Sequence, residues 1–183
     1  MIPGMNNSDV FIERLTLMVS GLEEAAAVGP PEAVRAAAPR ISHWMLVLRG
    51  EVPVLRGQAP AHPLLQGDDI VTSRLLFIDT DRGVARTISR WYRLGPRAPV
   101  ALPEEAGPGD LAATFADTEV KLLLGPTARV AGTNEVGAIL DTWPCDLLSV
   151  MGRMTGTNLN VRFAAVAEAW PPRPAVDGQA GQA

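Results

Sequence analysis

The stretch from Val52 to Gly95 constrains the fold more than any other part of the chain. Short runs of Val, Ile, Leu, Phe, Trp and Thr alternate there with turn residues, a pattern typical of β-strands. The run Ile70–Ile78 is followed by the turn sequence DTDRG and then by the run Val84–Leu94. The glycine of that turn can adopt a positive φ. We therefore predict an antiparallel β-meander, with its core at about residues 52–95.

Helical patterns lie on both sides of this meander. Residues 8–27 carry apolar side chains at the 3.6-residue period and form one apolar stripe, and the segment EAVRAAA predicts a short second helix that ends at Pro39. Four further helices are predicted at residues 110–124, 134–143, 144–154 and 158–170. The predicted fold class is α+β: a small antiparallel meander at about residues 44–95, an N-terminal helix and a C-terminal set of short helices.

The length and composition predict one domain. A chain of 183 residues with 47% hydrophobic and 20% charged residues can enclose a core of its own. We place a single domain at residues 1–170, with the meander core at 52–95 and the helical part at 109–170. The Pro- and Gly-rich segment 96–109 reads as a loop between them. Residues 171–183 have no apolar pattern, and we expect a disordered tail.

Features of the chain predict a soluble protein of the cytoplasm. The N-terminal residues lack the early basic charge and the apolar run of a secretory signal, and Ile41–Leu48 is too short to span a membrane. Cys145 is the only cysteine, so no intrachain disulfide can form, and we interpret Cys145 as a small core residue. No membrane partner is expected.

Several chemical motifs are absent from the sequence. The two histidines, His43 and His62, have no second ligand at zinc-binding spacing. Gly132 and Gly137 have the spacing of a phosphate-binding loop, but the Lys and Ser/Thr that must follow are missing, and no serine lies in a GxSxG turn. The sequence therefore predicts no catalytic residue, no metal and no cofactor.

Basic residues are concentrated in the middle of the chain. Residues 40–97 carry nine arginines against five acidic residues, whereas both flanking regions are acidic. If the DTDRG turn pairs Ile78 with Val84, one face of the hairpin carries Arg74, Arg86, Arg90 and Tyr92 among apolar side chains. Guanidinium groups bind phosphates and carboxylates, so this face predicts a site for an acidic protein or nucleic acid. The alternative is that the acidic C-terminal helices cover the face and the arginines pair internally.

One run of the sequence resembles a known family. The segment Gly57–Gly95 contains His-Pro, a glycine turn, Ile-x-Thr-Ser and Thr-x-Ser-Arg-x-Tyr-x-Leu-Gly in that order. This run is similar to a family of uncharacterised bacterial proteins of alphaproteobacterial type, for which no activity is assigned. The resemblance implies that the meander is the shared unit. The residues that we assign to this structural motif are His62, Pro63, Thr72, Ser73, Thr87 and Ser89.

Two function classes remain open at this stage. The first, which we favour, is a non-catalytic binding or regulatory module that uses the arginine-bearing face. The second is an enzyme with an unfamiliar site. The residues for such a site are His62, Asp68, Asp69, Thr72, Ser73, Ser89 and Arg90. A recognised enzyme of this size normally shows an activated nucleophile, an acid–base pair or a metal cluster, and this sequence shows none.

Overall fold

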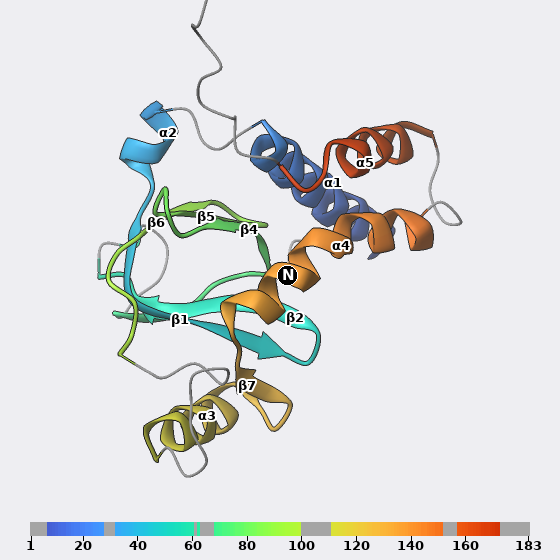
Figure 1. Cartoon of the computed structure of the whole chain (residues 1–183). Helices are drawn as coiled ribbons and strands as arrows, with labels where there is room; N and C mark the ends of the chain where they lie inside the picture. Colours follow the sequence, from blue (N-terminus) through green and yellow to red (C-terminus); the bar gives the residue numbers. More distant parts are fainter. Residues whose placement is uncertain are drawn as a thin grey trace, which may run out of the picture.

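In a computed structural model of the chain, the described residues form a seven-stranded mixed sheet and five helices (Figure 1). The structure describes residues 7–27, 32–60, 62, 68–99, 111–151 and 157–172. The elements are α1 (Asn7–Ala26), α2 (Glu32–Ala37), β1 (Arg40–Arg49), β2 (Val52–Gln58), β3 (Asp69–Val71), β4 (Leu75–Asp79), β5 (Val84–Thr87), β6 (Trp91–Leu94), α3 (Leu111–Leu124), β7 (Ala128–Val130), α4 (Thr133–Met151) and α5 (Thr157–Ala169). The α+β class is confirmed.

Strand β1 divides the sheet into two halves. On one side it pairs antiparallel with β2, which pairs with β3, and the end of β1 also pairs with β7. On the other side the start of β1 pairs parallel with β6, which continues through β5 to β4. We call these the hairpin half (β2, β3, β7) and the meander half (β4, β5, β6). The parallel pairing of β1 with β6 makes the sheet mixed, whereas the other pairings between the named strands are antiparallel as predicted.

The main core lies between the two halves of the sheet. Its buried side chains come from β1, β2 and β3, from all three strands of the meander half, and from α4. Figure 1 shows the meander half folded over β1 and β2, with α4 alongside. The helices α1 and α5 lie side by side on the outer face of the meander half, whereas α3 covers the outer face of the hairpin half. Each layer therefore buries an apolar face against the next.

The two long strands that we predicted at residues 70–78 and 84–94 are each broken. The first separates into β3 and β4 at Thr72–Arg74, and the second into β5 and β6 at Ile88–Arg90. At the second break Thr87 Oγ1 donates to the carbonyl of Arg90 at 3.1 Å and accepts from its N–H at 3.3 Å. A hydroxyl that binds nearby backbone groups in this way competes with the strand ladder.

The predicted hairpin register is wrong by one residue beside the turn. Ile78 pairs with Ala85 and Asp79 with Val84, and an irregularity separates these pairs from Leu75, which pairs with Thr87. Because side chains alternate between the faces of a strand, a shift of one residue exchanges the faces. Phe77 therefore packs with Val84 and Trp91 on the outer face and Ile78 packs against the main core, whereas Leu75 keeps the predicted pairing and points into that core.

Helix α4 is continuous where we predicted two helices. Pro144 lies inside it and has no N–H to donate to the carbonyl of Leu140. The indole Nε1 of Trp170 donates to that carbonyl at 2.8 Å instead, so a residue that follows α5 satisfies the group that the proline leaves open. On the same helix Cys145 is exposed, so its interpretation as a core residue is wrong.

Some predictions fall outside the described residues. These are Pro63, residues 100–109 of the crossing loop and residues 173–183 of the tail. Strand β7 was not predicted, because three residues are too few to show a strand pattern. Among the helices that the structure describes, none is long and apolar enough to cross a membrane.

Candidate binding surface

The hydroxyl side chains of the shared run meet where the two broken strands turn. Ser73 Oγ lies 2.9 Å from Ser89 Oγ and accepts a hydrogen bond from the backbone N–H of Ser89 at 3.2 Å. Thr87 Oγ1 lies 3.3 Å from Ser89 Oγ. Thr72 Oγ1 accepts from a backbone N–H of β2 at 3.0 Å. These contacts hold the two turns together and satisfy polar groups that the broken ladders leave open.

His62 and Tyr92 form a second contact of the shared run. Nε2 of His62 lies 3.2 Å from the hydroxyl of Tyr92, and the two rings stack with their centroids 6.1 Å apart. Burial lowers the pKa of His62, and the positive charge of Arg90 lowers it further. Burial raises the pKa of Tyr92, which Arg90 partly offsets. Burial thus favours the neutral form of both rings.

The hydrogen bonds described above do not place a base beside either serine hydroxyl. A catalytic serine needs a base within about 2.6–3.2 Å of its hydroxyl. Ser73 and Ser89 contact each other, and His62 contacts Tyr92. Within the described ranges, moreover, no group of three His, Cys, Asp or Glu side chains could hold a metal ion. The enzyme hypothesis gains no support from these contacts.

Arg86 is buried beneath α1. Its Nε donates to Glu24 Oε2 at 3.0 Å, and its Nη1 donates to the carbonyl of Thr87 at 2.6 Å. The indole Nε1 of Trp91 donates to the same Glu24 oxygen at 2.8 Å. One carboxylate on α1 thus binds two side chains of the meander half. The side chain of Arg86 is only 8% exposed and cannot reach a partner in this conformation.

Arg74 packs against α4. Its guanidinium carbon is 4.0 Å from the ring centroid of Trp143 on α4, and its Nε is buried without a hydrogen-bond partner among the described residues. Burial lowers its pKa to about 10. Arg74 packs on α4, Arg86 is covered by α1 and Arg90 lines a groove beside α2, so the three guanidinium groups do not form one exposed cluster. The alternative of internal pairing holds for Arg86, although its partner is on the N-terminal helix.

Exposed arginines do gather elsewhere on the same outer face of the meander half. Arg93 and Arg40 are register partners on β6 and β1, so their side chains point to one side of the sheet. Both are exposed, and the Nε of Arg93 donates to the carbonyl of Ala38 at 2.9 Å. Gly95 leaves the space for Arg40, because a Cβ there would lie 2.9 Å from the arginine's Nε.

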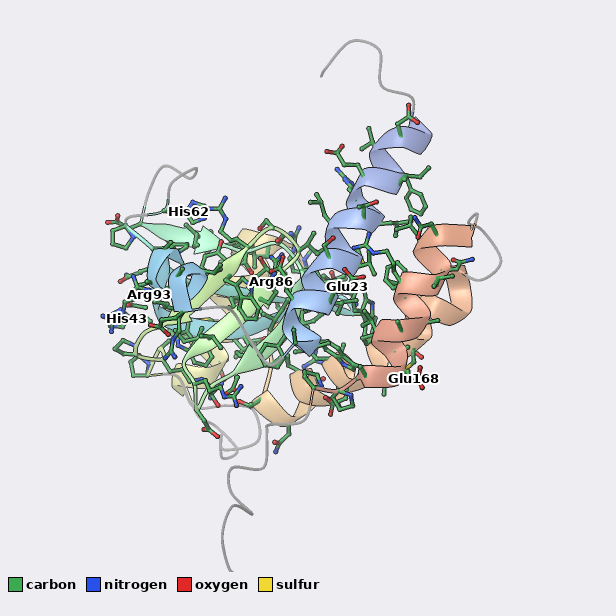
Figure 2. The ribbon with its side chains drawn as sticks, turned by 90° about the horizontal axis from the view of Figure 1, so that it is seen from above. Glu23, His43, His62, Arg86, Arg93 and Glu168 are labelled. Carbon is green, nitrogen blue, oxygen red and sulfur yellow. The ribbon has the colours of Figure 1, made fainter. Side chains whose placement is uncertain are left out.

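Two further arginines lie beside these strands. Arg35 is exposed on α2, and Arg90 lines an open groove of about 430 Å³ between α2 and the start of β6. The rest of this groove is mostly apolar, with Val34 and Trp91 among its walls. We call Arg35, Arg40, Arg90 and Arg93 the arginine surface. In Figure 2 Arg93 lies near α2 at the side of the molecule, whereas Arg86 lies beside α1.

A model of a family of unknown function, DUF6634, matches residues 15–134. This match covers more than half of the 183 residues. The chain belongs to the DUF6634 family. The comparisons with curated proteins and with solved structures gave no match. The DUF6634 region runs from α1 to the start of α4. It therefore contains the arginine surface and the hydroxyl network, which consists of Thr72, Ser73, Thr87 and Ser89. Helix α5 lies outside it.

Sequence reasoning missed three of the four residues of the arginine surface. Only Arg90 was among the predicted partner-binding residues. Arg40 and Arg93 lie 53 positions apart in the sequence and meet through the parallel pairing of β1 with β6. The excess of arginine in the middle of the chain pointed to a basic surface there, but no spacing rule places Arg40 and Arg93 side by side.

Proposed function

We propose that this DUF6634 protein is a non-catalytic binding module that engages an acidic protein segment through the arginine surface. The observation that carries the proposal is an exposed set of guanidinium groups around an apolar groove. Among the residues that the structure describes, Arg35, Arg40 and Arg93 form no salt bridge, whereas Arg56, Arg86 and Arg162 do. The positive charge of Arg35, Arg40 and Arg93 is therefore available to a partner.

The groove defines the kind of segment that fits. An apolar side chain can enter between α2 and β6, where Val34 is 42% exposed, while neighbouring carboxylates bind the guanidinium groups. Arg90 keeps its predicted role in this proposal. Arg74, Arg86 and Tyr92 do not, since α1, α4 and the core cover them.

An acidic protein segment fits better than nucleic acid. The whole chain has a formal net charge of −4, which opposes the non-specific phosphate attraction on which nucleic-acid binding depends. The arginine surface is small and has an apolar centre, which suits a peptide with mixed apolar and acidic side chains. We further propose a cytoplasmic location, which the single cysteine supports.

The test measures binding of a fluorescein-labelled peptide of glutamate and leucine by fluorescence anisotropy. The double variant Arg40→Gln/Arg93→Gln should weaken binding about three- to thirtyfold, as expected for two exposed ion pairs. The matched control is Arg14→Gln/Arg49→Gln, which removes two exposed arginines away from this surface and should leave binding unchanged. The loss should be larger at low salt than at high salt.

Two results would contradict the proposal. Equal weakening by both double variants would show that only net charge matters, and an absence of peptide binding would remove the acidic partner. Tighter binding of a single-stranded oligonucleotide that also depends on Arg40 and Arg93 would replace the acidic protein by nucleic acid.

A further inference from the structure

A second cavity lies at the opposite end of the β4 strand from the hydroxyl network. It has a volume of about 520 Å³, within the range of small-molecule sites. Its walls come from three places: the end of β4 with the turn that follows, the middle of α4, and residues 170–172. Phe77, Leu140 and Trp170 supply apolar surface. The hydrogen bond from Trp170 to the carbonyl of Leu140 fixes two of these walls to each other.

The charges that line this cavity are mainly negative. Asp79, Asp81 and Asp141 line it together with one cation, Arg82. Asp79 accepts from the backbone N–H of Arg82 at 2.8 Å and lies 3.6 Å from its Nε, so its charge is balanced within the turn. Asp81 and Asp141 are exposed and form no salt bridge among the described residues. They come from different walls, the turn and α4, and leave a net negative charge beside an apolar interior.

We propose that this cavity binds an organic cation, in which an amidinium, guanidinium or ammonium group is attached to an apolar body. The carboxylates of Asp81 and Asp141 attract the cationic group, and the surface of Phe77, Leu140 and Trp170 receives the apolar part. A metal ion fits less well, since no three such ligands converge among the described residues. The arginine surface has the opposite charge and meets this cavity at the turn, where Nη2 of Arg35 donates to the carbonyl of Arg82 at 3.1 Å.

Gly137 provides a way to close the cavity without disturbing the fold. It lines the cavity from α4, and a Cβ built on it would meet nothing within 4 Å. A leucine at this position therefore projects into open space that the ligand would occupy. Helix α4 also tolerates the change, because leucine forms helices more readily than glycine.

The experiment titrates the full chain with benzamidine and with benzamide, which has nearly the same shape and no charge, and follows the indole fluorescence and NMR shifts of Trp170. Benzamidine should bind and benzamide should not. Asp141→Asn should weaken benzamidine binding about two- to fivefold, as for one exposed ion pair. Gly137→Leu should abolish binding with an unchanged or higher Tm. Asp146→Asn, an exposed position of α4 that does not line the cavity, is the matched control.

Equal affinity for benzamidine and benzamide would overturn the proposal, because the cavity would then be only apolar. Normal binding by Gly137→Leu, or no binding of benzamidine to the unaltered chain, would also overturn it. A short peptide with adjacent Phe and Arg distinguishes the source of the cation. Tighter binding of this peptide identifies an arginine side chain of another protein, and tighter binding of benzamidine identifies a free small molecule.

Discussion

Two regions of one sheet face carry the same residue type with different consequences. Beneath α1, Arg86 is bound by Glu24 and by backbone carbonyls and is 8% exposed. Beside α2, Arg93 and Arg40 lie on the same outer face and remain exposed. The strands are neighbours, so the difference comes from the helix above each. A long helix encloses the first region, whereas α2 has only six residues and leaves the second open.

The comparison separates structural arginines from available ones. An arginine that loses water must gain other partners, because a buried charge without them is costly. Arg86 gains them from α1 and from its own strand. Arg93 remains exposed to solvent and donates one hydrogen bond to the carbonyl of Ala38, just after α2.

The largest expected effect is at the covered region. Arg86→Gln removes the ion pair with Glu24 and the hydrogen bond to the carbonyl of Thr87, and should lower the free energy of unfolding by about 2–3 kcal/mol in urea denaturation. Arg93→Gln is the matched change in the open region and should cost less than about 1 kcal/mol. Equal losses would mean that cover by α1 does not distinguish the two arginines.

The contact between α1 and the sheet can be tested at Gly21. A Cβ there would lie 2.6 Å from Cδ1 of Leu76, which is fully buried, and 3.4 Å from Nη2 of Arg86. Gly21→Ala should therefore cost about 1–3 kcal/mol through overpacking, although alanine favours the helix. Thermal unfolding measures the change, and a raised Tm would show that α1 packs less closely than described.

The same substitution on α4 should have the opposite sign. Gly137 meets nothing within 4 Å, so Gly137→Ala should raise the free energy of unfolding by about 0.5–1 kcal/mol through helix propensity alone. The two Gly→Ala variants thus compare a covered helix face with an open one. A lowered Tm for Gly137→Ala would mean that the cavity wall is already occupied.

The smallest expected effect concerns the helices that form the cover. A hydrogen bond from Arg162 on α5 holds the pKa of Glu23 on α1 below its usual value of 4.5, against an opposing effect of burial. Because the folded-state pKa is lowered, this contact stabilises fully above about pH 4.5 and is lost as the pH falls further. Glu23→Gln should flatten the pH dependence of stability below 4.5 by under about 1 kcal/mol, since both side chains are partly exposed.

The control for this last variant is Glu13→Gln, an exposed position on the same helix. For Glu13→Gln, the free energy of unfolding, measured by urea denaturation at several acidic pH values, should depend on pH as steeply as in the unaltered chain. An equally steep pH dependence of stability in Glu23→Gln and Glu13→Gln would show that the contact between Glu23 and Arg162 does not stabilise the packing of α1 against α5.

Local patterns in the sequence predicted most of the elements. The apolar stripe of α1 and the position of the DTDRG turn were found correctly because each depends on residues close together in the chain. The register of the β4–β5 hairpin was wrong, because the irregularity after Leu75 has no separate signature. Pro144 indicated a helix end, but the partner that makes the proline tolerable, Trp170, is 26 positions away.

The sequence predicted the candidate site only as an excess of arginine in the middle of the chain. The sequence by itself determined that the middle of the chain is basic, that strand and turn patterns alternate there, and that no familiar catalytic motif is present. The tertiary structure decided which arginines are covered and which are open. That choice depends on the parallel pairing of β1 with β6 and on the lengths of α1 and α2. These are contacts between distant segments, whose exposure no local period or spacing can encode.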